Sequence, residues 1–325
     1  KTDFIGDGVE EVGEAYLDLS PLEILDLRVG RQILTWGIGD LVFINDLFPK
    51  DFVSFYVGRG QEYLKAPSDA LKASLFPGPV SLDLVAIPLF TPSEVPRGDR
   101  LSFFDPFARS LAAPGQRLAI REPATTLGNT QLAARLSRTF GSYEAALYAF
   151  RGFFPEPAGM DPSRRELFFP KLSAYGTSLR GPLAGGVAGL EFGLSDSRQD
   201  RSGADPNIEN SALKYLLSYE RELWADLTVR AQYSVEQMLD FRAYRASLSA
   251  GDPRKKEFRH LLFLRLTHLV RYQTVELSLV GFYSPSDEDA YLGPQVAYKV
   301  TDRWTVTAGA NIFLVIDGTL VTPTP

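Results

Sequence analysis

The sequence predicts an all-β protein built as one antiparallel transmembrane β-barrel, with about 14 strands in this chain. The first observation is alternation: from Leu223 to Glu236 the odd positions are apolar or aromatic, and the even positions are polar apart from Trp224. A strand directs successive side chains to opposite faces, so this segment has one apolar and one charged face. The second observation is that very short turns alternate with long connections, as they do in bacterial outer-membrane barrels.

Composition agrees with this class and excludes several others. The 325 residues are 45% hydrophobic and 23% charged, which is too apolar for a disordered chain. No run approaches 18 uninterrupted apolar residues, so the sequence predicts no transmembrane helix. The absence of cysteine excludes disulfides, thiolate zinc sites and a cysteine nucleophile. With a net charge of -6, we expect no nucleic-acid partner.

The expected strands follow from the positions of alternating segments. In chain order they are 11–19, 21–33, 70–76, 79–88, 130–140, 142–151, 171–180, 183–194, 211–220, 223–236, 257–269, 271–283, 290–300 and 302–313. Alternation is clear in 302–313, where Trp304 and Val306 alternate with Arg303 and Thr305. In 211–220 one residue, Leu216, is apolar at a polar position.

The connections divide into two kinds. Short turns are expected near Ser20-Pro21, Pro77-Gly78, Gly141-Ser142, Gly181-Pro182, Arg221-Glu222, Val270-Arg271 and Thr301-Asp302. Long connections are expected at 33–69, 88–129, 152–169, 195–210 and 237–256. Outer-membrane barrels place short turns in the periplasm and long loops outside the cell, so these long connections are expected to be extracellular.

The two ends of the chain raise the expected strand number. A short first turn would put residue 1 outside the cell, whereas bacterial barrels keep both termini in the periplasm and have an even number of strands. Residues 317–325 also lack the pattern of a final strand. We therefore expect that this chain lacks the first and last strands of a complete barrel of about 16 strands; the alternative is a barrel of about 14 strands with one end mis-assigned. The chain starts at Lys1 without an apolar export segment, so we expect that any signal peptide has been removed.

Catalytic, metal and cofactor sites are not expected. The two histidines, His260 and His268, share one face of a strand but lie eight residues apart, which is about 27 Å at the rise of a strand. They cannot share a metal ion, and they are in phase with apolar residues of the outer face. The sequence therefore predicts that the protein is not an enzyme.

Charged residues on the opposite phase are expected to line the lumen, because charges on a membrane strand avoid lipid. Acids and bases on this phase are nearly balanced, so the wall alone predicts no strong ion preference. A barrel of about 16 strands leaves an aqueous channel unless loops fill it. The lumen-facing candidates are Arg28, Lys72, Arg135, Lys214, Asp226, Arg230, Arg265 and Glu276.

Two long connections are rich in apolar residues. Connection 88–129 combines these with arginines, which suits a segment folded into the pore; the alternative is a cap outside it. The candidates for a constriction there are Arg97, Arg100, Asp105, Arg109, Arg117 and Arg121. Connection 33–69 is similarly apolar, and its part from Asp51 to Tyr56 is expected to form a short helix in the lumen, with the same alternative.

A short pattern near the N-terminus carries a family resemblance. Gly30-Arg31-Gln32 stands at a strand end and is followed by Trp36-Gly37 and by Asp51-Phe-x-x-Phe. Over about 70 residues this resembles alginate-export-type and related proteobacterial outer-membrane porins. The resemblance implies an outer-membrane channel with a polar lumen. It transfers no substrate, because those exporters have a strongly basic lining and the lumen expected here is balanced.

The resulting functional hypothesis is a porin-like channel for passive or facilitated passage of small hydrophilic solutes through the outer membrane of a Gram-negative bacterium. Two alternatives stay open: a barrel sheath that encloses a partner such as an electron-transfer cytochrome, and a non-conducting surface scaffold. The expected partners are membrane lipid, lipopolysaccharide and the solutes. A homo-oligomer or a partner protein in the lumen is also compatible with the sequence.

Overall fold

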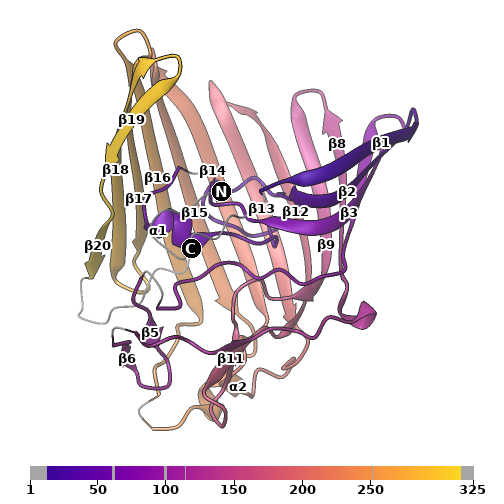
Figure 1. The fold of residues 1–325 in the computed structure, drawn as a ribbon, viewed down its shortest axis with the longest axis vertical. Coiled ribbons are helices and arrows are strands. Elements are labelled where there is room, and N and C mark those ends of the chain that lie inside the picture. Colours follow the sequence, from indigo (N-terminus) through magenta and orange to yellow (C-terminus); the bar gives the residue numbers. More distant parts are fainter. Residues whose placement is uncertain (1–12, 61–62, 99–100, 114, 251, 316–325) are drawn as a thin grey trace.

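The protein forms one large antiparallel sheet that curls into a barrel wall (Figure 1). The structure is a computed structural model and describes residues 13–60, 63–98, 101–113, 115–250 and 252–315. The sheet has 15 strands, each paired with its neighbour along the chain except that β19 and β20 both pair with β18. The strands are β1 (Ala15–Leu22), β2 (Leu25–Ile33), β3 (Pro67–Leu75), β4 (Val80–Ile87), β8 (Gln131–Phe140), β9 (Tyr143–Phe153), β12 (Lys171–Leu183), β13 (Gly186–Ser197), β14 (Ala212–Trp224), β15 (Leu227–Met238), β16 (Phe258–Val270), β17 (Val275–Ser284), β18 (Asp289–Thr301), β19 (Trp304–Gly309) and β20 (Ile312–Val315).

This arrangement confirms the predicted fold class. Every expected strand overlaps an observed one, and β19 with β20 occupies the place of the single strand expected over 302–313. The edges of the sheet are β1 on one side and β19 and β20 on the other. The expectation of a complete barrel of about 16 strands stays a prediction, and residues 1–12 and 316–325 lie outside the described residues.

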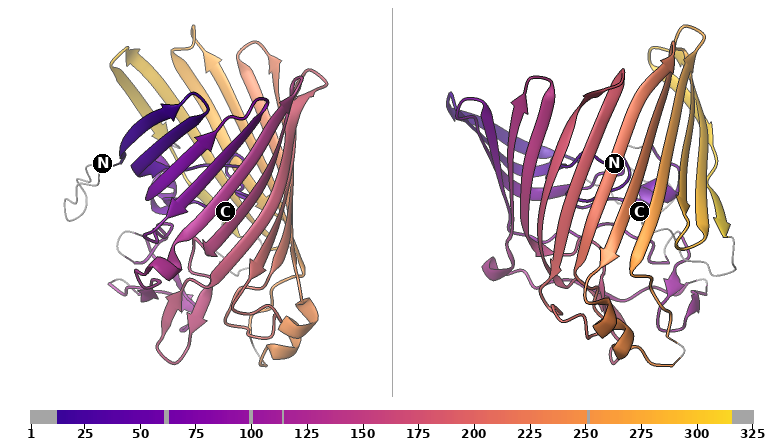
Figure 2. Two further views of the ribbon diagram at one scale, coloured as in Figure 1. Left: turned by 90° about the vertical axis from the view of Figure 1, so that its right-hand side faces the viewer. Right: turned by 180° about the vertical axis from the view of Figure 1, so that it is seen from behind.

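Short turns and long loops gather at opposite ends of the barrel, which we call the turn end and the loop end (Figure 2). The loop end carries β5 (Phe104–Asp105), β6 (Ser110–Leu111), β7 (Ile120–Arg121), η2 (Leu127–Asn129), β10 (Gly159–Asp161), β11 (Glu166–Phe168) and α2 (Phe241–Ser247). The other helix, α1 (Phe52–Tyr56), lies inside the curl of the sheet (Figure 1). Neither α-helix of the described part of the chain could span a membrane.

Three turns lie three or four residues later than the sequence indicated, and one of them moves a predicted lumen residue. The turns expected near Ser20-Pro21, Gly181-Pro182 and Arg221-Glu222 lie instead at 23–24, 184–185 and 225–226. Strand β14 continues to Trp224, and Asp226 then adopts a left-handed conformation with φ 64°. Aspartate tolerates that conformation better than most residues. Asp226 is therefore an exposed turn residue that accepts a hydrogen bond from Gln273, and its assignment to the lumen wall was wrong.

The two faces of the sheet differ in chemistry. Large apolar side chains remain exposed on the convex face along the whole sheet, among them Leu136, Leu190, Leu217 and Leu264. The concave face carries the charged residues and the contacts with the connection between β2 and β3. An apolar outer surface around a polar interior is the arrangement of a transmembrane β-barrel of the outer-membrane type, with the outer surface in contact with lipid.

Candidate functional site in the barrel lumen

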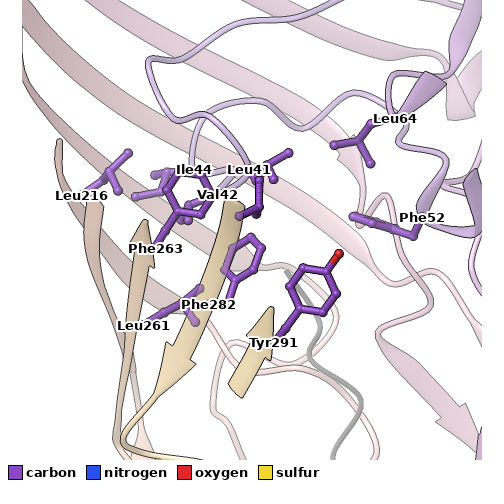
Figure 3. Packing of buried hydrophobic residues seen from close by; sticks show 11 residues of the cluster. Leu41, Val42, Ile44, Phe52, Leu64, Leu216, Leu261, Phe263, Phe282 and Tyr291 are labelled. Carbon is purple, nitrogen blue, oxygen red and sulfur yellow. The ribbon is translucent and has the colours of Figure 1, made fainter. Parts of the chain in front are cut away.

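Residues 34–66, which we call the inner segment, connect β2 to β3 by passing through the interior of the barrel. Leu41, Val42 and Ile44 pack against inward-facing residues of one wall, including Leu216 and Phe263 (Figure 3). All five side chains are buried, and burial of an aliphatic or aromatic side chain contributes about 1.5–3 kcal/mol. Leu216 is apolar at a polar position of its strand because the inner segment covers it.

A second cluster fixes the inner segment to the opposite wall. Leu34 and Phe48 pack with Val85, Phe150 and other inward residues of strands β3, β4, β8, β9 and β12. Phe48 is among the most completely buried side chains of the described residues. Because the two clusters lie on different parts of the wall, the inner segment reaches from one side of the lumen to the other.

Inward-facing glycines let the backbone of the inner segment approach the sheet. A Cβ atom added to Gly193 would lie 2.6 Å from Ile44 Cγ2, and one added to Gly189 would lie 2.5 Å from Ile38 Cδ1. Real Cβ atoms do not approach other atoms that closely. The absence of side chains at these positions on β13 therefore makes room for the inner segment against the wall.

Glu191 on β13 is the main polar attachment between wall and inner segment. Its carboxylate accepts hydrogen bonds from the backbone N–H of Ile38 at 2.9 Å, the backbone N–H of Asn45 at 3.0 Å and Asn45 Nδ2 at 2.9 Å. Only 4% of Glu191 is exposed. Several donors converging on one buried carboxylate offset its loss of hydration and fix the path of the chain between 38 and 45.

A buried ion pair holds the inner segment to itself. Lys50 Nζ lies 2.9 Å from Asp46 Oδ1 and donates to the carbonyl oxygen of Phe48 at 2.7 Å. Asp46 also accepts a hydrogen bond from Thr35 Oγ1 at 2.8 Å. The side chains of Lys50 and Asp46 are 2% and 5% exposed, so removal of either partner would leave the other charge buried without compensation.

Asp40 connects the inner segment to two arginines of the wall. Its Oδ2 atom lies 3.3 Å from Arg230 Nη1 on β15 and 3.1 Å from Arg265 Nη2 on β16. Arg230 also forms an ion pair with Glu220 on β14. Two carboxylates thus face two guanidinium groups, and this cluster is electrically balanced.

Helix α1 is capped and tethered within the barrel, as expected for the stretch from Asp51 to Tyr56. Asp51 caps its N-terminus by accepting a hydrogen bond from the backbone N–H of Ser54 at 2.7 Å. At the other end, Asn311 Nδ2 donates to the carbonyl oxygen of Tyr56 at 2.6 Å, and Tyr291 donates to Asn311 at 2.7 Å. Burial raises the pKa of the Tyr56 hydroxyl well above its ordinary value, so this side chain is neutral at physiological pH.

A contact with the loop end reaches the inner segment through Ser93. Its hydroxyl accepts from the backbone N–H of Lys50 at 3.0 Å and donates to Glu156 Oε1 at 2.8 Å. Burial raises the pKa of the Glu156 carboxyl. The start of connection 88–129 therefore contacts the inner segment.

A cavity of about 540 Å³ lies between the inner segment and strands β12 to β15. This volume falls in the range of sites for small molecules. Its lining mixes apolar residues of the inner segment with charged and polar residues of the wall. The charged lining residues are Asp40, Lys65, Arg180, Glu220 and Arg230.

The remaining lumen-facing candidates lie on the concave face, in register with one another. In the strand register, Arg28 of β2 lies opposite Lys72 of β3, and Arg230 of β15 lies opposite Arg265 of β16. Arg135, Lys214 and Glu276 also have cross-strand partners that face inward. Most of these charges form ion pairs within the wall: Arg28 with Asp18, Lys72 with Asp83, Arg135 with Glu144 and Lys214 with Glu236.

Three of the constriction candidates of connection 88–129, Asp105, Arg109 and Arg121, form ion pairs with other long loops at the loop end. Arg121 pairs with Glu166 at 2.6 Å, and Asp105 lies 3.6 Å from Arg165. Arg109 pairs with Asp252 in the connection that follows α2.

The other three candidates stay predictions. Arg97 is half-buried, Arg117 is exposed, and Arg100 lies outside the described residues. Long loops therefore clasp one another across the barrel mouth, and the expectation of a constriction between the walls is corrected for Asp105, Arg109 and Arg121. The segment that lies between the walls is the inner segment, residues 34–66.

Sequence reasoning did not single out Asp40, Glu191 and Gln232, which join the inner segment to the wall. The sequence did carry one signal for the wall that the inner segment covers. Inward positions of β14, β16 and β17 are apolar at Leu216, Phe263 and Phe282. Apolar side chains are unfavourable in a water-filled lumen unless another part of the protein covers them. Within the described residues, no three potential metal-ligating side chains lie together.

Comparisons with known proteins gave structural similarity only. No family model and no curated protein matches the sequence. OccD3 of Pseudomonas aeruginosa is 11% identical with a TM-score of 0.49, and the match covers 94% of this chain and 73% of that one. OmpT, an outer membrane protein of Vibrio cholerae solved as a loop-deletion mutant, is 10% identical with a TM-score of 0.46, covering 92% and 78%. An anion-selective porin from Comamonas acidovorans is 10% identical with a TM-score of 0.43; the match covers 86% of this chain and 66% of that porin.

Proposed function

We propose that the protein is a porin-like channel in the outer membrane of a Gram-negative bacterium, for passive or facilitated passage of small hydrophilic solutes. The observation that carries this proposal is the polar cavity of about 540 Å³ inside a sheet whose outer face is apolar. A charged interior without an aqueous path would be expensive to bury, and a path for water serves small polar solutes as well.

The inner segment serves as the constriction. It crosses the lumen between two apolar clusters and is fixed by Glu191 and by the Asp40 ion pairs. Because the narrow part of a channel decides what passes, solute selection depends on residues of 34–66 and the wall that faces them.

The orientation follows from the two ends of the barrel. The short turns lie in the periplasm and the loop end faces outside the cell, as in outer-membrane barrels generally. The clasped loops then form the external mouth. The resemblance to alginate-export-type porins agrees with an outer-membrane channel and adds no substrate.

A lumen crossed by the chain's own segment favours a channel over a sheath around a partner protein. The outer face contacts lipid, and the loop end contacts lipopolysaccharide. The protein works as a channel and performs no catalysis.

Reconstitution into planar bilayers tests the proposal. We expect stepwise conductance in potassium chloride, together with swelling of proteoliposomes that depends on solute size. Protein that inserts, shows the heat-modifiable gel migration of a folded barrel and gives no current would refute the channel. As a control for the constriction, deletion of 38–45 should raise the unit conductance.

A further inference from the structure

We propose that the cavity beside the inner segment is a binding subsite for the carboxylate of a small organic acid with a short apolar chain. This inference deepens the proposed channel function, because the acid would reach the cavity through the lumen. It rests on two cations and a hydrogen-bond donor that have no partner among the described residues, and on the apolar part of the lining.

The charges that line the cavity do not cancel. Asp40 and Glu220 are neutralised by Arg230, which contacts both, and by Arg265, which contacts Asp40. Arg180 on β12 also lines the cavity, and within the described part of the chain its guanidinium has neither an ion pair nor a hydrogen bond.

The acidic residue directly opposite Arg180, on strand β9, is Glu144. Glu144 already forms an ion pair with Arg135. Lys65 approaches the cavity from the end of the inner segment, and among the described residues its ammonium group likewise has no partner. Within the described part of the chain, the cavity therefore presents two uncompensated positive charges, one from the wall and one from the inner segment.

Gln232 adds an unused donor. Its Oε1 atom accepts a hydrogen bond from the backbone N–H of Asp40 at 3.3 Å, so the amide orientation follows from that contact. Its Nε2 atom has no partner among the described residues, although only 3% of the residue is exposed. A buried amide N–H without an acceptor costs free energy, which a bound oxyanion would recover.

The rest of the lining selects the body of the ligand. Ile38, Leu41 and Leu64 of the inner segment and Val187 of β13 border the same cavity. These side chains favour a short hydrocarbon chain over a fully hydroxylated one. Cations with a neighbouring apolar surface match a monocarboxylate such as butyrate better than a free inorganic anion or a neutral sugar.

Trp36 provides a direct reporter, because it lines the cavity and the chain has only three tryptophans. In a background with Trp224→Phe and Trp304→Phe, its emission is followed in detergent micelles at low salt. Butyrate is the ligand, and butyramide is the neutral control of the same size. We expect a saturable change with butyrate and none with butyramide.

The charge variants test the assigned residues. Arg180→Gln combined with Lys65→Gln should weaken butyrate binding at least about tenfold, since two charge-assisted contacts are lost. Arg28→Gln is the matched control, because Arg28 is a wall arginine already paired with Asp18, and it should bind butyrate normally. Folding of each variant is checked by heat-modifiable gel migration.

Equal responses to butyrate and butyramide in the parent protein would overturn the proposal, and this comparison does not depend on any charge variant folding. Unchanged affinity in the folded double variant would also overturn it. Parallel bilayer recordings separate the two claims. Current without a selective butyrate response would support the channel and overturn the subsite. Saturable butyrate binding without current would support the subsite and overturn the channel.

Discussion

Replacing Glu191 by glutamine should loosen the inner segment without unfolding the barrel. In the structure one carboxylate oxygen, Oε2, accepts from the backbone N–H of Ile38, and the other, Oε1, accepts both donors of Asn45. A glutamine keeps one acceptor oxygen and places an NH₂ group against a donor. At least one buried N–H then loses its partner, which costs about 1–3 kcal/mol.

That free energy corresponds to a change of about 5–150-fold in the equilibrium for local opening of the inner segment. Hydrogen–deuterium exchange of the reconstituted protein measures it directly. The amides of Ile38 and Asn45 should exchange faster by about that factor, while amides of the β13–β14 ladder stay protected.

The matched control is Glu276→Gln. Glu276 also faces the lumen, is exposed, and has no hydrogen bond or ion pair in the described part of the chain. It should leave exchange at 38–45 unchanged. If Glu191→Gln leaves those amides as protected as in the parent, or if it raises exchange equally throughout the sheet, Glu191 does not anchor the inner segment.

Three further predictions concern packing, the lipid face and the barrel mouth. Gly193→Ala should destabilise the protein by about 1–3 kcal/mol and lower the midpoint of its thermal unfolding, because the new methyl group overlaps Ile44. Leu264→Arg should lower the free energy of unfolding in vesicles by about 2–4 kcal/mol, since this exposed outer-face residue lies near the middle of β16. Hydrogen bonds from the backbone N–H of Ser249 and from Arg109 hold the pKa of Asp252 below its usual range. The contact between Arg109 and Asp252 is therefore complete above the ordinary aspartate pKa and is lost as pH falls through the lowered value. Protease cleavage within 101–113 should rise in acid.

Each of these has a control. Gly281→Ala meets nothing closer than the Cδ2 atom of the flexible Leu292 side chain, at 3.3 Å, and should lower the midpoint of thermal unfolding much less. Thr267→Arg places the same charge on the inward face of the strand that carries Leu264, so it should cost much less; equal costs would contradict the assignment of faces. Asp252→Asn should be cleaved alike at neutral and acid pH, and cleavage that still depends on pH would assign the effect to another group.

The sequence predicted the strands well because lipid and water impose opposite requirements on the two faces. Every second residue of β15, for example, has to be apolar, and that constraint is visible without a structure. Turn positions were less certain, because Asp226 adopts a backbone conformation that alternation does not encode.

The occupant of the lumen was harder to predict. Connections 33–69 and 88–129 are both apolar, so composition did not separate them. Contacts such as Asp40 with Gln232 join residues 192 positions apart, and nothing in the spacing of either residue indicates the other. The informative signal was the wall itself, where Leu216 and Phe263 occupy positions that water would otherwise cover.

The central claim, an aqueous channel beside the inner segment, is tested most directly by blocking it from within. The chain has no cysteine, so Ser218→Cys, in the cavity lining, gives a single labelling site. Its neighbour Leu217→Cys, 52% exposed on the outer face, is the control. We expect a charged, water-soluble thiol reagent to reduce the single-channel conductance of Ser218→Cys and to leave that of Leu217→Cys unchanged. Conductance that persists unchanged after complete labelling at residue 218 would contradict a conducting path through this cavity.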